Sequence, residues 1–362
     1  MRIGFFTDTF LPQTNGVVTS ILNFGVALTE RGHEVHIFCP KTKVKEYRGV
    51  TVHSYPAVPF RPYPEFKIAI PQGKEKVPPL DIVHTHSPFT MGFFGWRVAK
   101  FQKIPKVSTF HTLLSEYVSY VRLGGPFAKF ITWKLCTFFY NRHKKLIAPS
   151  RSLKRILKEK GVKKPIEIIP TGIDLKQYRP IDKETARKKI GYGNGRIFLS
   201  LGRISQEKNL DVIIKAMEKV DGTLLVAGRG PAKPKLEKLV QKLGLRKKIH
   251  FVGYVPEADK PYYYSAADAF IIASTSETQA IVVAEAMACG CPAIGAKSLA
   301  TPEIVANGKN GYLFEPNNSD ELSKIIREFE PSEKMSKIAV ETAKKFCLEN
   351  CVARLEKLYT SL

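Results

Sequence analysis

Residues 274–292 read Ser-Thr-Ser-Glu-Thr-Gln-Ala-Ile-Val-Val-Ala-Glu-Ala-Met-Ala-Cys-Gly-Cys-Pro. They follow an apolar run, residues 269–273, of the kind that forms a buried parallel strand. The three polar residues at the start can cap a helix, which the apolar and helix-forming residues 281–288 would continue. Gly290 and Pro292 predict the end of that helix. A strand, a polar turn and a helix in this order leave backbone N–H groups at the helix N-terminus, where an anion binds well.

Two carboxylates, Glu277 and Glu285, flank this turn. Eight residues of regular helix rise ~12 Å, well beyond the ~5.5 Å between the paired carboxylates of a retaining glycosidase. The two glutamates are therefore expected to bind different parts of one extended ligand rather than to form an acid and base pair. The spacing alone also fits two structural roles, a carboxylate favoured by the helix dipole for Glu277 and a surface charge for Glu285.

Length and charge give the first constraints on the class of protein. A chain of 362 residues with 44% hydrophobic residues is natural for two folded domains. The net charge is +24, and the first 170 residues alone hold 27 Lys/Arg against 10 Asp/Glu. This half is expected to face an anionic surface such as lipid headgroups, nucleic acid or an acidic polymer. A Lys-rich thermophilic composition is the alternative explanation.

Cysteine usage and hydropathy exclude several other classes. The six cysteines show no doubled C-x-x-C pattern with zinc spacing and indicate a reducing compartment. No run of 18 apolar residues predicts a membrane-spanning helix. The first residues read as a strand rather than as a signal peptide.

Strands alternate with helices in the first half and predict a parallel sheet. A strand at 2–6, a loop ending in Asn15-Gly16, a helix at 17–31 and a strand at 35–39 form a βαβ unit. This unit lacks G-x-G-x-x-G, which argues against a nicotinamide cofactor. Residues 59–79 contain six prolines and read as a loop.

Histidines end two of the predicted strands. The strand at 81–86 ends in His84-Thr85-His86; an H-x-H pair can bind a metal, but no third ligand is apparent. We expect these side chains at the carboxyl edge of the sheet, where open α/β sheets bind their ligands. His111 ends the strand at 106–110, and the pattern alone favours an ordinary histidine at a sheet edge.

The segment from residue 97 to 158 is strongly basic and aromatic. It contains 14 Lys/Arg and one acidic residue, Glu116. Residues 127–146 read as a helix whose basic and aromatic side chains suit an anionic membrane interface, where each cation contributes ~1 kcal/mol. The alternatives are a solvated basic face and a nucleic-acid surface, although no nucleic-acid-binding module is recognisable. The expected membrane contacts are Lys129, Trp133, Lys134, Arg142, Lys144 and Lys145.

Several motifs together resemble the retaining GT-B glycosyltransferases of family 4. They are Thr-Phe-His-Thr at 109–112, Pro-Thr-Gly-Ile-Asp at 170–174, Gly-Arg-x4-Lys at 202–208, Glu-x7-Glu at 277–285 and Pro-Glu-Ile-Val through Gly at 302–311. The resemblance covers nearly the whole chain. The sequence departs from the family at Ala280, where Gly is usual, and at 297–300, where Lys-Ser-Leu-Ala replaces glycines, so that donor-sugar selectivity is open.

The resemblance implies an α/β fold of the GT-B type, with two doubly wound Rossmann-like domains that face each other across a cleft. Residues 1–170 would form the acceptor-side domain, with a C-terminal helix at about 345–362 packing back on it. Residues 171–344 would form the nucleotide-sugar-binding domain.

The resemblance also implies roles for individual residues. Arg203 and Lys208 would stabilise the charge left on the leaving diphosphate, as preplaced cations do without a metal. Glu277 and His111 would orient the donor sugar, and Glu285 would hold the ribose. Same-face attack with the leaving phosphate as base is implied, since no nucleophilic carboxylate is obvious. The donor-binding set is Gly16, Tyr254, Val255, Gln279, Ala280, Ile281, Val282 and Glu285.

We therefore predict a retaining, metal-independent transferase that moves a hexose, glucose by preference, from a nucleotide-diphosphate sugar to a membrane lipid such as 1,2-diacylglycerol. Residues 84–89 and 110–112 resemble diacylglycerol glucosyltransferases and phosphatidylinositol mannosyltransferases most. The donor nucleotide would be UDP rather than GDP, with no cofactor. The protein would be cytoplasmic and peripheral on the inner face of the cell membrane, with no specific nucleic-acid partner.

Two alternatives to this prediction stay open. Within the class, the acceptor could be phosphatidylinositol, a soluble sugar or a sugar phosphate. Outside it, the chain could be a non-catalytic membrane- or polyanion-binding protein on a GT-B scaffold.

Overall fold

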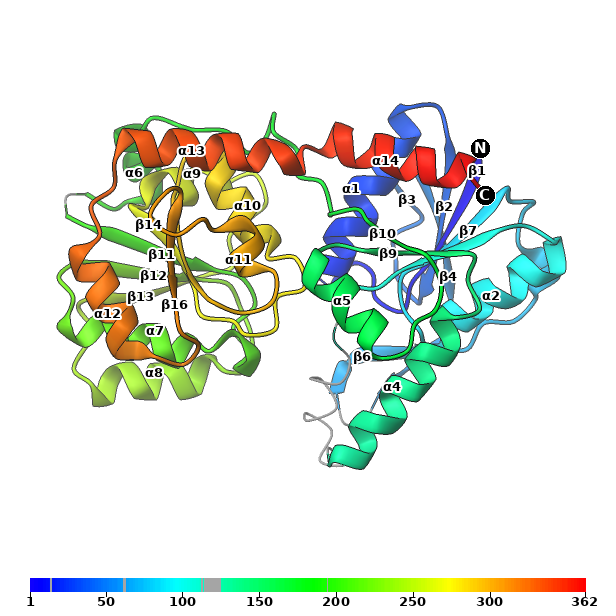
Figure 1. Ribbon diagram of the computed structural model, residues 1–362, viewed down its shortest axis with the longest axis horizontal. Helices are drawn as coiled ribbons and strands as arrows, with labels where there is room; N and C mark the ends of the chain where they lie inside the picture. Colours follow the sequence, from blue (N-terminus) through cyan, green and yellow to red (C-terminus); the bar gives the residue numbers. More distant parts are fainter. Residues whose placement is uncertain (14, 61–62, 112, 114–124, 194) are drawn as a thin grey trace. The chain divides into compact units, whose positions relative to one another are not determined.

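The computed structural model describes residues 1–13, 15–60, 63–111, 113, 125–193 and 195–362. These residues form two compact units (Figure 1). Unit 1 comprises Met1–Gly172 and Leu348–Leu362, and unit 2 comprises Ile173–Cys347. Each unit is built on a mainly parallel sheet with apolar cores on both faces. Both are therefore Rossmann-like α/β structures, as the sequence predicts.

The sheet of unit 1 has eight strands in the order β10-β9-β8-β7-β1-β2-β4-β3. All neighbours are parallel except the short β3, which runs antiparallel to β4. The strand order reverses between β1 and β7, so the loops that follow these strands meet at one edge. The bounds are β1 Arg2–Phe6, β2 Glu34–Pro40, β3 Glu46–Tyr47, β4 Val50–Tyr55, β7 Ile82–Thr85, β8 Lys106–Thr109, β9 Lys145–Ala148 and β10 Ile166–Ile168.

Helices cover both faces of this sheet. One core joins the apolar faces of α1 and α14 to Phe5 and Ile37, and the other joins α2 to Phe6 and Phe38. Adjacent residues of β1 thus serve opposite cores, as the alternation of a strand requires. The bounds are α1 Gly16–Glu30, η1 Lys74–Lys76, α2 Thr90–Gln102, α4 Pro126–Tyr140, α5 Arg151–Glu159 and α14 Leu348–Thr360.

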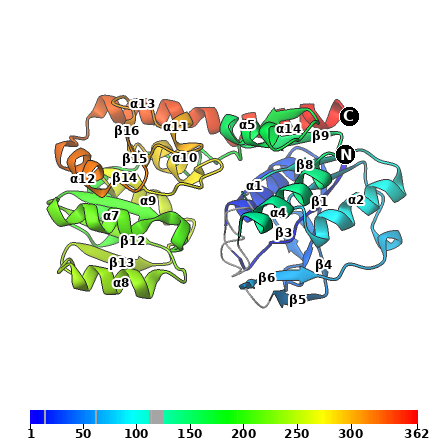
Figure 2. The same cartoon turned by 60° about the horizontal axis from the view of Figure 1, so that its bottom comes forward.

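Two sequence-based expectations for unit 1 are wrong. Residues within the predicted loop at 59–79 pair as an antiparallel hairpin of β5, Ala57–Phe60, and β6, Tyr63–Ala69 (Figure 2). Proline is tolerated in such a two-stranded ribbon because one edge of each strand needs no N–H donor. The helix predicted at 127–146 ends at Tyr140, because Lys145 already belongs to β9.

Unit 2 contains a six-stranded, wholly parallel sheet in the order β13-β12-β11-β14-β15-β16. This is the doubly wound order in which the first and fourth strands are neighbours at the centre. The bounds are β11 Ile197–Leu201, β12 Thr223–Ala227, β13 Ile249–Gly253, β14 Ala269–Ile272, β15 Ala293–Ala296 and β16 Gly311–Phe314.

The helices of unit 2 divide between its two cores. Apolar side chains of α7, α8 and α12 pack on one face of the sheet, and those of α9, α10 and α13 pack on the other face. The bounds are α6 Lys183–Ile190, η3 Gln206–Lys208, α7 Leu210–Ala216, η4 Met217–Lys219, α8 Lys233–Lys242, α9 Lys260–Ala266, α10 Ile281–Ala288, α11 Thr301–Ile304, α12 Ser319–Glu328, α13 Glu333–Ala343 and η5 Lys344–Phe346.

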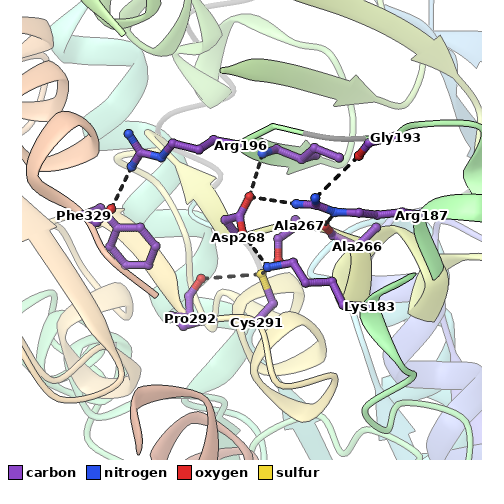
Figure 3. Close-up of polar contacts among 11 residues, drawn as sticks. Lys183, Arg187, Gly193, Arg196, Ala266, Ala267, Asp268, Cys291, Pro292 and Phe329 are labelled. Carbon is purple, nitrogen blue, oxygen red and sulfur yellow. Dashed lines mark hydrogen bonds and ion pairs between the residues drawn. The ribbon is translucent and has the colours of Figure 1, made fainter. Parts of the chain in front are cut away.

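A buried carboxylate ties α6 to the sheet of unit 2. Asp268, directly before β14, accepts hydrogen bonds from the backbone N–H of Ile197 (2.7 Å) and from Arg187 Nη2 (3.0 Å). Lys183 pairs with its other oxygen, so the side chains of α6 converge on this carboxylate (Figure 3). The contact fixes the start of β14 and with it the register of the central strand pair.

Candidate active site

The candidate donor site lies at the carboxyl edge of the unit 2 sheet, where β11 and β14 are neighbours. The loop after β11 carries Arg203 and Lys208, and the loop after β14 carries Glu277. Open α/β sheets bind ligands at this point because the loops of adjacent strands diverge there. The topology therefore brings together residues that are 69 positions apart in the chain.

Glycines let the loop after β12 support the loop that bears the two cations. A Cβ on Gly228 would lie 1.8 Å from the carbonyl oxygen of Gly202, and one on Gly230 would lie 2.2 Å from that of Ile204. Hydrogen bonds join the loops, with Gly202 N donating to Ala227 O (3.0 Å). Only glycine permits this close approach, so the position of the cation-bearing loop is fixed by backbone contact.

Lys208 and Glu277 form an ion pair in the structure. Lys208 Nζ lies 2.5 Å from Glu277 Oε1, with the Glu277 side chain 13% exposed. The backbone carbonyl of Glu277 also accepts from Ala300 N (3.2 Å). The structure thus brings the predicted phosphate-binding cation and the predicted sugar-binding carboxylate side by side.

The start of α10 differs from the sequence-based expectation. The helix begins at Ile281, and its N-cap is Ala280 in the left-handed conformation (φ 57°), not one of the three preceding Ser and Thr residues. The N-cap side chain makes no capping hydrogen bond, and a helix N-terminus of this kind is a favourable place for an anion. Glu277 precedes the helix, so the ~12 Å rise of a regular helix does not apply to the whole interval up to Glu285.

Glu285 is buried rather than a surface charge. It is 2% exposed and accepts a hydrogen bond from the Tyr264 hydroxyl (2.8 Å). Lys260 Nζ lies 4.0 Å from the same carboxylate oxygen and 2.6 Å from Glu257 Oε2. Burial raises the pKa of Glu285, while Lys260 opposes that shift. Tyr264, Lys260 and Glu257 belong to α9 and the loop before it, and the sequence analysis did not single them out.

The loop after β13 provides an exposed ring next to a cation. Tyr254 is half-exposed, and Arg229 Cζ lies 5.7 Å from the centroid of its ring. Val255, by contrast, is buried in the unit 2 core. A flat ring beside a guanidinium suits a nucleotide base. Arg229 is not among the predicted site residues, because its contact with Tyr254 joins the loops after two different strands.

The remaining donor-binding predictions lie around the start of α10 and of α1. Gln279 and Ala280 are buried, and Ile281 and Val282 are partly exposed in the first turn of α10. In unit 1, Gly16 begins α1, and a Cβ there would meet nothing within 4 Å. Asn15 Oδ1 caps α1 by accepting from the N–H groups of Val17 and Val18 (both 3.0 Å).

Histidines meet at the carboxyl edge of the unit 1 sheet. His86 follows β7 and His111 follows β8, and these strands are parallel neighbours. His86 Nδ1 lies 2.9 Å from His111 Nε2. Burial lowers the pKa of His111 to about 3 and that of His86 well below its usual value, so both rings are neutral.

The helix α4 presents a stripe of exposed apolar side chains. These side chains recur every three or four residues, and Lys134 is exposed on the same face. Arg142 follows the helix, and its guanidinium lies over the ring of Phe138. Lys134 and Arg142 are among the predicted membrane contacts, whereas the apolar residues of the stripe are not. Trp133 stacks on Phe110 (centroids 6.0 Å apart), and Lys145 pairs with Glu167, so neither belongs to the stripe. The stripe consists of Phe127, Phe130, Ile131, Leu135 and Phe138.

The other two predicted membrane contacts, Lys129 and Lys144, differ in their exposure and in their position relative to α4. Lys129 is partly exposed on α4, and Lys144 is exposed after the helix, where its ammonium donates to the carbonyl of Leu362. Periodicity of the apolar residues could have identified the stripe from the sequence, because 127, 131, 134 or 135, and 138 share one helix face.

Comparison with known proteins identifies the family. Residues 14–177 match the family model "Glycosyltransferase Family 4", and residues 182–346 match "Glycosyl transferases group 1". The alpha-monoglucosyldiacylglycerol synthase of Streptococcus pneumoniae is 34% identical over 87% of this chain and 75% of its own. That of Acholeplasma laidlawii is 32% identical over 100% and 97%. The chain belongs to the GT-B glycosyltransferases of family 4.

Solved GT-B structures agree with this fold. Anabaena Alr3699/HepE in complex with UDP-glucose superimposes with a TM-score of 0.84 at 21% identity, covering 100% of both chains. At that identity the likeness concerns the fold.

Within the described residues, no group of three or more His, Cys, Asp or Glu side chains could hold a metal ion. None of the described helices is both long and apolar enough to cross a membrane.

Proposed function

We propose that this glycosyltransferase moves a hexose, glucose by preference, from a UDP-sugar to a membrane-lipid acceptor such as 1,2-diacylglycerol, with retention and without a metal or other cofactor. It would act as a cytoplasmic, peripheral protein on the inner face of the cell membrane. The observation that carries the lipid acceptor is the exposed apolar stripe of α4 with its basic residues. The names of the two synthases described above agree with this choice.

The donor half of the proposal rests on the charges around the β11 and β14 loops. Arg203 and Lys208 supply positive charge where the diphosphate would leave, and the uncapped N-terminus of α10 adds backbone N–H donors. When phosphate oxygens take up Lys208, Glu277 is released from its ion pair and can accept hydrogen bonds from the sugar. The exchange would couple donor binding to orientation of the sugar.

The acceptor half rests on α4. Five large apolar side chains in a stripe, with exposed fractions of 41–74%, exceed what a solvated helix face normally carries. Lys134 is exposed on the same helix face, and the guanidinium of Arg142 lies over the ring of Phe138. Apolar residues inserted among acyl chains and cations near lipid phosphates bind an anionic interface, with roughly 1 kcal/mol per cation.

A transfer screen tests both halves. Purified protein is mixed with UDP- and GDP-sugars, with and without vesicles of phosphatidylglycerol that contain diacylglycerol, and release of nucleoside diphosphate is measured. We expect release with UDP-glucose that depends on the diacylglycerol vesicles, and a glycolipid product with the anomeric configuration of the donor. Lys208→Ala or Arg203→Ala should lower turnover by about 10²–10³-fold, with Lys219→Ala, at a surface pair with Asp320, as the control.

The role of α4 in binding the membrane that holds the acceptor is tested separately. Phe130→Glu should weaken vesicle binding by roughly tenfold or more, because burying a phenylalanine contributes about 1.5–3 kcal/mol. Phe101→Glu is the matched control, since Phe101 is similarly exposed on α2. Release stimulated by soluble sugars or by phosphatidylinositol instead of diacylglycerol would exclude the proposed acceptor. No release of nucleoside diphosphate with any donor would favour a non-catalytic binding protein. Unchanged turnover in the Lys208 variant would contradict the role proposed for Lys208.

A further inference from the structure

A buried pair of neutral histidines defines which nitrogen of His111 carries its proton. His86 Nδ1 and His111 Nε2 are 2.9 Å apart, a hydrogen-bond distance, and their rings are tilted by only 22°. Between two neutral imidazoles such a bond contains one proton, so one ring donates and the other accepts. Which ring donates decides the tautomer of both.

The ring of His86 is held in place by its neighbours. It stacks on His84, with centroids 4.1 Å apart, and meets the edge of Phe5 at 4.8 Å. His84 is itself fixed by hydrogen bonds to the hydroxyls of Tyr359 (2.6 Å) and Thr109 (2.7 Å). His86 is 2% exposed, so its ring has no room to turn away from His111.

The far nitrogen of His86 decides the direction of the hydrogen bond. His86 Nε2 is buried and has no hydrogen-bond partner among the residues that the structure describes. If His111 donated, the proton of His86 would reside on Nε2, as an N–H donor buried without an acceptor. Orphaned buried N–H donors are rarer than orphaned acceptors, so the proton belongs on Nδ1.

We propose that His86 is a positioning residue that donates from Nδ1 to His111 Nε2 and thereby holds His111 as the neutral Nδ1–H tautomer. His111 then carries its proton on Nδ1 and none on Nε2. Its use in orienting a donor-sugar hydroxyl rests on the proposed function; the tautomer itself does not. His86 would act on the reaction only through His111.

The tautomer can be read directly by NMR in protein labelled with ¹⁵N-histidine. The signals of His111 are assigned by their loss in His111→Gln. We expect His111 in the wild type to carry its proton on Nδ1. His86→Asn should preserve this state, because its amide N–H can donate from the position of Nδ1, whereas His86→Leu should release His111 toward the Nε2–H tautomer.

Turnover separates positioning from a purely structural role. His86→Leu should lower kcat by roughly tenfold, the factor that corresponds to one hydrogen bond, and leave the affinity for UDP unchanged. His86→Asn should recover most of kcat, and tryptophan fluorescence would verify folding of both variants. An Nε2–H tautomer in the wild type, or an unchanged tautomer and kcat in His86→Leu, would overturn the inference. Failure to bind UDP or release it from any donor would refute the proposed function and leave the tautomer measurement valid.

Discussion

At the scale of single residues, Ala280 shows how a departure from the family pattern is accommodated. The chain passes through the left-handed region at this residue (φ 57°), which explains why the family usually has Gly there. An alanine in this region costs roughly 1 kcal/mol. Ala280 is buried at the N-cap of α10 and packs in the unit 2 core. This packing offsets the conformational cost and holds the residue in the left-handed conformation.

Replacing Ala280 by Gly should therefore be neutral or stabilising, although glycine normally destabilises a folded chain. The strain relieved and the added freedom of the unfolded chain are each about 1 kcal/mol. Ala284→Gly is the matched control, because Ala284 is equally buried but lies inside α10 and should lose about 0.5–1 kcal/mol. Urea unfolding followed by circular dichroism measures both. A loss for Ala280→Gly as large as that for Ala284→Gly would contradict the explanation.

At the scale of elements, the contact between α6 and the central strands depends on one carboxylate. Asp268 is 7% exposed and is satisfied by Lys183, Arg187 and the N–H of Ile197. A buried charge with its partners present is tolerated, but the cations left after its removal have no counter-charge. Only Ala186 of α6 is fully buried, and Arg187 Nε also donates to Ala266 O (3.1 Å).

Asp268→Ala should consequently destabilise unit 2 by about 3–5 kcal/mol. Hydrogen exchange of the β11 and β14 amides should report the loss, since these strands adjoin the carboxylate. Asp211→Ala, at the exposed pair with Lys215 on α7, should change stability by no more than about 0.5 kcal/mol. Equal protection of β11 in the two variants would show that the carboxylate does not tie α6 to the sheet.

At the scale of the whole molecule, unit 1 concentrates buried histidines. Burial lowers the pKa of His111 and His143 to about 3 and that of His84 and His86 well below the usual value. The folded unit therefore binds fewer protons than the unfolded chain between roughly pH 3 and 6.5. Stability from these residues is complete above pH 6.5 and is lost as the pH falls below it.

Unit 1 should thus become less stable on acidification from pH 7.5 to 5, by up to about 1.4 kcal/mol per pH unit for each histidine. Burial raises the pKa of the Asp8 carboxyl, so this one group opposes the loss of stability that the four histidines cause. Tryptophan fluorescence during urea unfolding isolates this unit, because Trp96 and Trp133 are the two tryptophans of the chain and both belong to it. His143→Gln should lower the number of protons taken up on unfolding by one and so reduce the slope of the unfolding free energy against pH. A midpoint independent of pH between 7.5 and 5 would contradict the argument, and the histidines contribute no slope between pH 7.5 and 8.5.

The sequence by itself determined the alternation of strands and helices, the family, and the loops that carry Arg203, Lys208 and Glu277. These features depend on the local hydrophobic period, turn residues and short motifs, which can be identified directly from the sequence. The same local reasoning extended α4 too far and chose the wrong cap for α10, because the end of α4 depends on pairing of β9 and the cap on a strained backbone.

Only the tertiary structure decided which distant side chains meet. It paired Lys208 with Glu277, buried Glu285 against Tyr264, joined His86 to His111, and left the apolar stripe of α4 exposed. Strand order and burial set these contacts, and a parallel sheet brings loops together irrespective of their separation in sequence. A residue type and its spacing define what chemistry a side chain can perform, whereas its partner and its access to solvent follow from packing.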